Sequence, residues 1–258
     1  MKFLLQGDFL LTANREDILD NPWNRALLEA CADAFVLAIP HLNRGYRKYL
    51  WTRYIPGQHI HGFFEPLRGM ILDKLSQEPI LEACSGRMVA PAVLTYVPPF
   101  RFTDDAKTPL TLAPNTKDSY LSHSYIGLSE TLLSRLGTRT LDGEGFLQDL
   151  SSMISNYTQL FRQKSRAWHE KLAQALLTLY DEEHHRDIIR GLEIIPLSNN
   201  EWVSADSGPI HLSQDTQHLN IPETVRLRTV SASIKQDPSR ISLLVHLGVK
   251  PRLDVADV

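Results

Sequence analysis

An arginine in a short acidic turn is the first residue of this chain whose type and setting suggest chemistry. Arg15 lies in the segment Asn14–Ile18, between an apolar stretch and the start of a helical pattern. A guanidinium on a rigid turn can direct its planar, permanently charged fork toward a phosphate. The same group could instead form a salt bridge with Glu16, Asp17 or Asp20, and chemistry alone does not separate the two interpretations.

Histidines and acids gather in three places where a metal ion could be considered. The three groups are His59-x-His61, Trp168-His169-Glu170 and Glu182-Glu183-His184-His185. A helical two-histidine zinc site needs ligands four residues apart on one face. Neighbouring residues of a helix point about 100° apart, so we expect His184 and His185 not to chelate one ion. The sequence therefore predicts no metal site, and a metal-dependent hydrolase that uses the histidines is kept as an alternative function.

Signatures of the common catalytic folds are missing from the sequence. It contains no G-x-x-x-x-G-K-[ST] or G-x-G-x-x-G loop to cradle a phosphate, and no G-x-S-x-G around a serine nucleophile. Two cysteines, Cys31 and Cys84, are too few for a four-cysteine zinc site or a disulfide framework. We therefore expect the chain by itself to hold no cofactor and to be no enzyme.

Cations and aromatic rings alternate in the segment Arg44–Tyr54. The cations are Arg44, Arg47, Lys48 and Arg53, and the rings are Tyr46, Tyr49, Trp51 and Tyr54. Such a mixture can stack on and neutralise a single-stranded nucleic acid, which is a second alternative function. We favour instead a half-buried segment whose rings fill the core while its cations stay in water. Nucleic acid is therefore not the partner that we expect.

The composition narrows the function classes further. Of 258 residues, 43% are hydrophobic and 22% are charged, and the formal net charge is −3. A chain of this size can bury a large core in one or two domains, and its weak charge argues against a broad nucleic-acid or membrane-surface binder. No apolar run reaches the roughly 18 residues of a membrane span, and the few cysteines suggest a reducing compartment. We expect a cytoplasmic protein, with the nucleus as the second option.

Periodic apolar residues predict the elements that position these groups in the first half. Residues 2–12 resemble one interrupted strand or two short strands. A helix is predicted to begin at Asn21–Pro22, where an N-cap residue precedes a proline. Apolar residues then recur every four positions over Trp23–Ile39, and Pro40 is expected to end that helix. A second helix is predicted at residues 66–77.

The second half is predicted to be mainly helical, with one β-hairpin. Helices are predicted at residues 130–136, 146–154 and 168–179, and strands at 194–197 and 202–205. Asn199–Asn200 lies between the two strands and tolerates positive φ, which is typical of a hairpin turn. We expect Trp202 to pack on the helix that contains Trp168, because an isolated hairpin is only marginally stable.

A short sequence similarity occurs between the two halves of the chain. Leu132–Thr138 and Leu243–Val249 share four identities in seven positions, written LLSRLGT and LLVHLGV. Many helices that end in a glycine cap would look similar. Chance similarity and a further repeat beginning near residues 226–258 therefore remain two open interpretations.

Several segments carry a resemblance to a known family. They are residues 9–18 with 21–28, 49–56, 120–137, 168–172 and 195–204, including the stretches FLLTANREDI, YLWTRYIP and IPLSNNEWVS. In this order they resemble sacsin-like proteins, which are large chains with a GHKL-type ATPase module and are numerous in fungi. The resemblance covers residues 3–249, and none of its segments is a catalytic signature.

The turn at Asn14–Leu19 is also similar to the middle domain of the ninety-kilodalton heat-shock chaperone. In that family an arginine of the turn reaches the γ-phosphate of ATP held by a neighbouring GHKL domain. Arg15 matches that arginine, whereas Leu19 stands where the family has a glutamine. Because a leucine cannot donate a hydrogen bond, the resemblance implies a smaller contribution to ATP hydrolysis here.

Together, the residues and the resemblances predict an α+β fold in two parts. Residues 1–112 are expected to form a post-ATPase segment, a small sheet backed by helices, and residues 113–258 a mainly helical module with a β-hairpin. The resemblance implies a chaperone-like interaction and coupling segment of a sacsin-like ATPase. Mg-ATP would be bound by a GHKL domain that precedes Met1, and that domain, in cis or in trans, and protein clients are the expected partners.

Overall fold

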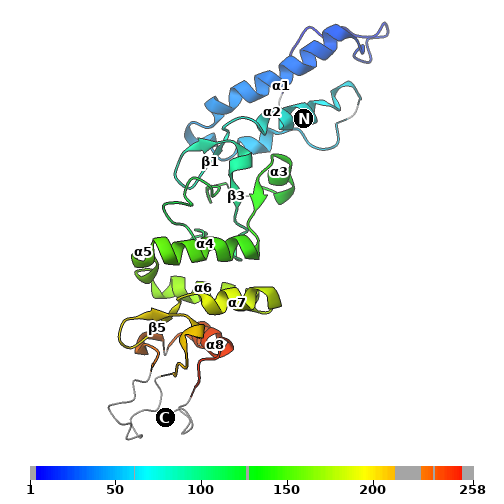
Figure 1. Cartoon of the computed structure of the whole chain (residues 1–258). Coiled ribbons are helices and arrows are strands. Elements are labelled where there is room, and N and C mark those ends of the chain that lie inside the picture. The colour runs from blue at the N-terminus through cyan, green and yellow to red at the C-terminus, as the bar shows by residue number, and fades with distance from the viewer. Residues whose placement is uncertain (1–3, 61, 126–127, 213–227, 235, 252–258) are drawn as a thin grey trace, which may run out of the picture. The chain divides into compact units, whose positions relative to one another are not determined.

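The chain folds into two compact units that are interleaved along the sequence (Figure 1). The computed structural model describes residues 4–60, 62–125, 128–212, 228–234 and 236–251. One unit is formed by residues 1–97 and 115–140, and the other by residues 98–114 and 141–258. The sequence analysis placed a boundary between residues 112 and 113. Residues 98–114 pack with the later part of the chain, because Phe102 stacks on Phe146 with 4.4 Å between the ring centroids.

The first unit begins without the expected strands. Residues 4–10 have no regular secondary structure, and the only pairing in residues 4–20 is a single antiparallel bridge between Leu11 and Ile18. The expectation of one or two strands at residues 2–12 is therefore wrong for the part that the structure describes. A strand needs a neighbour along its length, and no described segment pairs with residues 4–10.

Helices α1 (Pro22–Leu42) and α2 (Leu67–Leu75) pack against each other in the first unit (Figure 1). The Asn21 side chain caps α1 by accepting a hydrogen bond from the Asn24 backbone, as expected for an N-cap. Pro40 does not end the helix, which continues for two more residues. A proline in the last turn interrupts only one helical hydrogen bond, and the helix was already ending there.

The buried face of α1 is rotated from the predicted stripe. Its buried residues are Asn24, Leu28, Ala32 and Ile39, whereas Trp23 is 56% exposed. Helix α2 agrees with prediction, because its apolar residues Leu67, Ile71, Leu72 and Leu75 are all buried. The periodicity therefore identified both helices, while a buried asparagine moved the contact face of the first.

Short strands complete the first unit around helix α3 (Glu130–Arg135). Strands β1 (Leu81–Glu82) and β2 (Met88–Val89) pair in antiparallel fashion, and β3 (Thr95–Tyr96) pairs in parallel with β4 (Arg139–Thr140). Gly137 adopts a φ of 92° directly after α3, which confirms the predicted glycine stop. The core beneath these elements includes Trp51, which is fully buried.

The second unit contains two predicted helices, α4 and α6, and the predicted hairpin, together with helices that were not predicted. Its helices are α4 (Gly143–Asn156), α5 (Thr158–Arg162), α6 (Arg166–Tyr180), α7 (Glu183–Gly191) and α8 (Pro238–His246). Strands β5 (Ile195–Pro196) and β6 (Trp202–Val203) form an antiparallel hairpin, and Asn200 adopts a φ of 68° in its turn. The predicted α+β fold class is thus confirmed: helices accompanied by small sheets.

The two units share one folding motif. Each copy of the motif begins with a helix, which is α2 in the first unit and α7 in the second. A hairpin of the same register and a short 3-10 turn follow, and a later helix, α3 or α8, is followed by a glycine with positive φ. The hairpin pairs Leu81 with Val89 in one unit and Ile195 with Val203 in the other. Residue numbers in the hairpin and the 3-10 turn differ by 114 between the copies, as do those of the hydrogen bonds Glu78–Leu75 and Leu192–Ile189 at the ends of the first helices. No insertion therefore separates the two copies between the end of the first helix and the hairpin, although the helix bounds themselves differ by 116.

Backbone hydrogen bonds repeat in the same positions of both motifs. Matching donor–acceptor pairs are Glu78–Leu75 with Leu192–Ile189, Ile80–Glu78 with Ile194–Leu192, Ala83–Arg87 with Leu197–Glu201, Ser122–Glu82 with Ser231–Pro196, Arg139–Leu94 with Lys250–Ile210, and Thr138–Leu133 with Val249–Leu244. Such agreement exceeds a shared helix end. The two segments that share the short sequence similarity are therefore equivalent, and Leu243–Val249 closes the second motif.

No helix in the described part of the chain is both long enough and apolar enough to span a membrane.

Gly143 marks the tightest approach between helices in the second unit. A Cβ atom placed on it would lie 2.7 Å from Leu179 Cδ2 and 2.8 Å from His185 Cε1, both on buried side chains. Because a buried side chain must shift to admit the added methyl group, Gly143→Ala is expected to lower the free energy of unfolding by about 1–3 kcal/mol. Urea unfolding monitored by circular dichroism measures this change.

Gly191→Ala is the matched control in the same unit. Gly191 is the last residue of α7, and a Cβ there would meet no atom within 4 Å. We expect its free energy of unfolding to change by less than about 0.5 kcal/mol. Equal effects of the two substitutions would show that the close approach at Gly143 is not a packing constraint.

Candidate functional site

Arg15 occupies the tip of a turn held by its neighbours. Its φ is 57°, in the left-handed region that few non-glycine residues adopt, and its backbone N–H donates to the Thr12 carbonyl at 2.8 Å. The Asn14 side chain accepts from the Thr12 hydroxyl at 2.5 Å and donates to Glu16 at 2.9 Å. The backbone of Asp17 in turn receives a hydrogen bond at its carbonyl from Thr12, which closes the turn.

A buried asparagine attaches this turn to α1. The Asn24 amide donates to the carbonyls of Leu10 and Leu19, both at 2.7 Å, and its oxygen accepts from the Leu10 N–H at 2.9 Å. Asn24 is fully buried, so these bonds satisfy a polar group that would otherwise destabilise the core. The indole N–H of Trp23 adds a bond to the Asp8 carbonyl at 3.1 Å. The two arms of the turn are therefore fixed to the first turns of the helix.

The Arg15 side chain is exposed, and its guanidinium forms no ion pair or hydrogen bond with the described residues. The acids that could have paired with it have other partners: Asp20 forms a bidentate pair with Arg25 at 2.6 and 2.8 Å, and Glu16 accepts from Asn14. The hydrogen bond from Arg25 holds the pKa of the Asp20 carboxyl below its usual range. The salt-bridge interpretation of Arg15 is therefore not what the structure shows.

Exposed apolar side chains surround the Arg15 turn. Leu4, Leu10, Leu11, Leu19 and Trp23 are between 44% and 90% exposed. Large apolar side chains that gather in one short segment are typical of a protein–protein contact surface. Leu19 therefore lies on an exposed apolar part of the turn. We call residues 4–23 the Arg15 segment.

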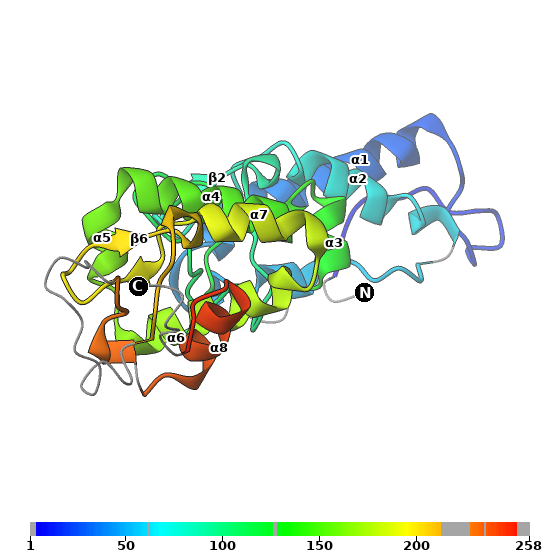
Figure 2. The ribbon, with the colours of Figure 1, turned by 60° about the horizontal axis from the view of Figure 1, so that its bottom comes forward.

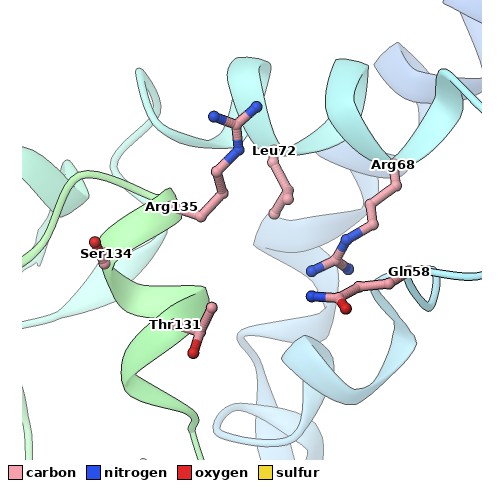
Figure 3. Close-up of a pocket in the computed structure, with 6 residues that line it drawn as sticks. All are labelled: Gln58, Arg68, Leu72, Thr131, Ser134 and Arg135. Carbon is pink, nitrogen blue, oxygen red and sulfur yellow. The ribbon is translucent and has the colours of Figure 1, made fainter.

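A pocket of about 490 Å³ lies elsewhere in the first unit, between α2 and α3 (Figure 3). It is lined by Gln58, Arg68, Leu72, Thr131, Ser134 and Arg135. Figure 3 shows that Arg68 and Gln58 point toward each other, while the Arg135 guanidinium points away from them. Arg68 donates to the Pro56 carbonyl, and Arg135 lies 3.7 Å from Asp73. Since its two cations do not converge, this pocket is not the stronger candidate.

The aromatic and basic segment at residues 44–54 contributes to the core of the first unit. Trp51 is fully buried, and the Tyr49 hydroxyl donates to Glu82 at 2.9 Å. The Lys48 ammonium also pairs with Glu82, at 2.5 Å, and this hydrogen bond raises the pKa of Lys48. Two of the rings are thus used in packing or internal bonding, as the favoured interpretation of this segment expected.

In the second unit, an aromatic cluster holds a buried histidine against the hairpin. The His169 ring of α6 lies 5.4 Å from the Trp202 ring, between centroids, and Phe161 lies 5.4 Å from Trp202. The predicted packing of Trp202 on α6 is therefore confirmed, with His169 rather than Trp168 as the helix residue in contact. The sequence pattern gave no sign that this histidine would be inside the core.

A carboxylate near this cluster is buried between two arginines. Asp237, the N-cap residue of α8, is 0% exposed; Arg166 Nε donates to one of its oxygens, and Arg240 Nη1 lies 3.6 Å from the other. Burial lowers the pKa of Arg240, with Asp237 acting in the opposite direction. The i, i+3 spacing of Asp237 and Arg240 was visible in the sequence, whereas Arg166 comes from 71 residues away.

The structure also brings His184 and His185 together, contrary to the sequence argument. Their ring centroids are 3.9 Å apart at the start of α7, and Glu182 lies beside both. The 100° angle applies to the Cα–Cβ directions, but rotation about the side-chain bonds carries the two rings back toward each other. The other histidine pair, His59 and His61, cannot be compared, because residue 61 lies outside the described residues.

Comparison with known proteins finds one curated relative and no structural precedent. The chain is 26% identical over 271 residues to Protein NO VEIN from Arabidopsis thaliana. The aligned region covers 91% of this chain but only 10% of that protein, so the chain spans about a tenth of the length of the relative. No family model matches the sequence, and no solved structure matches the chain.

The buried His169 generates a pH-dependent prediction. Burial is the largest cause that lowers the pKa of His169 to about 4, and Arg240 and Lys164 act in the same direction, whereas Asp237 and a hydrogen bond to the Phe161 backbone oppose it. A histidine that is neutral when folded stabilises the fold fully above pH ~6.5, and this contribution is lost as the pH falls toward 4. The loss is expected to reach up to about 3 kcal/mol.

Denaturant unfolding of the wild type and His169→Gln between pH 7.5 and 4 tests this expectation. The glutamine variant cannot take up a proton, so its free energy of unfolding should fall less steeply over this range. Other titrating groups are present in both proteins and cancel in the difference. Parallel curves would show that His169 is not the group responsible.

Proposed function

We propose that this chain is a chaperone-like interaction and coupling segment that delivers Arg15 to a nucleotide bound by a neighbouring GHKL ATPase domain. The observation that carries the proposal is the exposed guanidinium of Arg15, which pairs with none of the described residues and lies on a turn fixed to α1. In this role the chain would hold no nucleotide itself, and would pass the nucleotide state of the ATPase domain to protein clients. We place it in the cytoplasm or the nucleus, with neither membrane nor nucleic acid as a partner.

The electrostatics of the Arg15 segment support this role. A guanidinium already paired with an internal acid would have to give up that pair before it could contact a phosphate, and Arg15 has no such pair among the described residues. An arginine delivered from a second domain neutralises charge that develops on the transferred phosphoryl group. Because the turn is fixed by side-chain hydrogen bonds, little backbone entropy is lost when the contact forms, and the entropy cost is that of ordering the Arg15 side chain.

The exposed leucines and Trp23 of the Arg15 segment would add an apolar contact area beside the charged Arg15 side chain. Charge alone would give a weak, salt-sensitive contact, whereas apolar area excluded from water adds affinity. The apolar side chains of the Arg15 segment flank the arginine on both sides in sequence. A partner domain that covers them would also exclude water from the guanidinium and strengthen its contact with an anion.

Substitution of Arg15 tests the proposal in a protein that carries this segment together with a GHKL ATPase domain. Arg15→Ala is expected to lower ATP turnover at least about tenfold, less than the roughly 10³–10⁵-fold effect of such arginines elsewhere, because Leu19 offers no second donor. Arg15→Lys should restore only part of the rate, since lysine lacks the planar fork. Steady-state ATPase assays measure both effects.

Arg25→Ala is the matched control. Arg25 is an exposed arginine ten residues away, and its guanidinium is already paired with Asp20. Turnover should be unchanged by this substitution, and circular dichroism should show that Arg15→Ala leaves the fold intact. Equal turnover in wild type and Arg15→Ala would refute the coupling role, as would unfolding of the isolated chain by Arg15→Ala.

The isolated chain is expected to show no heat of binding when titrated with Mg-ATP. No phosphate-cradling loop occurs in the sequence, and Arg15 by itself offers a single contact. Micromolar affinity in calorimetry would contradict the division of labour between this chain and an ATPase domain.

A further inference from the structure

Three potential metal ligands converge at the start of α7. Glu182 Oε2 lies 3.7 Å from His184 Nε2 and 3.4 Å from His185 Nδ1, and one ligand atom of each residue lies within 4.8 Å of the others. Carboxylate oxygen and imidazole nitrogen bind zinc at about 2.0–2.2 Å, which places neighbouring tetrahedral ligands about 3.3–3.6 Å apart. The two measured separations are therefore close to those of a tetrahedral site.

Within the described part of the chain, the imidazole ring of His185 is buried without the hydrogen bonds that a buried polar group normally forms. Its side chain is 3% exposed, and neither ring nitrogen has a hydrogen-bond partner among the described residues. Cε1 and Nε2 face Gly143, so Nδ1 is the nitrogen that faces Glu182. A buried polar group without a partner lowers stability by about 1–3 kcal/mol. An ion bound at Nδ1 would satisfy that atom.

The other copy of the motif shows what the packing requires at this position. Counted back from the hairpin without insertion, His185 corresponds to Ile71 of α2, which is fully buried. A hydrocarbon side chain therefore fills the same place in the first unit. Glu182 and His184 correspond to Arg68 and Met70, so all three potential ligands are particular to the second unit.

The charges around the cluster favour a cation. The segment 181–187 contains four carboxylates and one arginine. The Arg186 guanidinium is directed elsewhere, because it donates to the backbone carbonyls of Tyr180 and Asp181. Glu182 and His184 are partly exposed, at 47% and 70%, so an ion can enter from solvent.

We propose that Glu182, His184 and His185 bind a divalent transition-metal ion of the zinc type. The ligands are Glu182 Oε2, His184 Nε2 and His185 Nδ1, and the fourth position is left to water or to a side chain of a partner. A mixed nitrogen and oxygen set suits Zn²⁺ and its neighbours better than Mg²⁺ or Ca²⁺, which prefer oxygen alone. The ion would fix the start of α7 against α4, where His185 contacts Gly143.

Titration of the full chain with ZnCl₂ in a calorimeter tests the site directly. The wild type should bind one equivalent, and Glu182→Gln and His184→Ala should each weaken binding at least about tenfold. Glu183→Gln is the matched control, since it removes the same charge from the next residue and should leave affinity unchanged. Co²⁺ added in place of Zn²⁺ should give the absorption bands of a tetrahedral site in the wild type and in Glu183→Gln, and not in Glu182→Gln or His184→Ala.

The substitution His185→Ile tests whether Zn²⁺ binding can be removed without loss of the fold. It installs the residue that the first unit uses at the equivalent position, so the variant should fold and be at least as stable as the wild type without metal. It should also lose the binding of Zn²⁺ and any rise in melting temperature that Zn²⁺ causes. Equal binding by all variants, or no binding by the wild type up to about 1 mM Zn²⁺, would overturn the proposal.

Discussion

The second unit depends on one buried carboxylate. Asp237 is removed from water between Arg166 of α6 and Arg240 of α8, and these two helices lie side by side in both views of the chain (Figures 1 and 2). Removal of the Asp237 carboxylate would leave the Arg240 guanidinium, which is 12% exposed, without this partner, and loss of one partner from a buried pair is destabilising by about 3–5 kcal/mol. Asp237 and its two arginines thus connect α8 to α6, beside the buried Leu243 and Leu244 of α8. His169, on the same face of α6, then presents its ring to Trp202 of the hairpin.

Comparison of the two copies of the motif distinguishes residues that the fold requires from residues that occur in one copy alone. Left-handed positions in the two hairpin turns are held by Gly86 and Asn200, and both later helices end in glycine, so backbone geometry is preserved while residue identity changes. Buried positions follow the same rule, with Ile71 in one copy and His185 in the other. A polar residue that replaces a hydrocarbon at an equivalent buried position is not needed for packing. The replacement of Ile71 by His185 at equivalent positions is therefore better evidence for a functional role of His185 than its burial alone.

The sequence predicted elements better than it predicted contacts. Apolar periodicity and the glycine after residue 136 identified helices α1 to α4 and α6 and the hairpin, because these features depend on residues close in sequence. The strand expected at residues 2–12 was wrong, since pairing depends on a distant neighbour, and the exposed Trp23 was misplaced because buried Asn24 sets the face of α1. The convergence of His184 and His185 depends on side-chain torsions, and the link from Arg166 to Asp237 spans 71 residues. Neither leaves a local pattern.

One pair of equivalent positions near the first helix of each motif carries side chains of opposite charge. The position held by Glu182 in the second unit is held by Arg68 in the first, where it lines the pocket of Figure 3. The equivalent position therefore carries a cation beside a hollow in one unit, where it lies inside α2, and an acid beside two imidazoles in the other, where it is the extended N-cap residue of α7. Since the hairpin and helix fix both positions without reference to these side chains, each can change its ligand preference while the fold is kept. Arg15 follows the same logic, because Asn24 and the neighbouring backbone fix its turn and leave its guanidinium free for a partner.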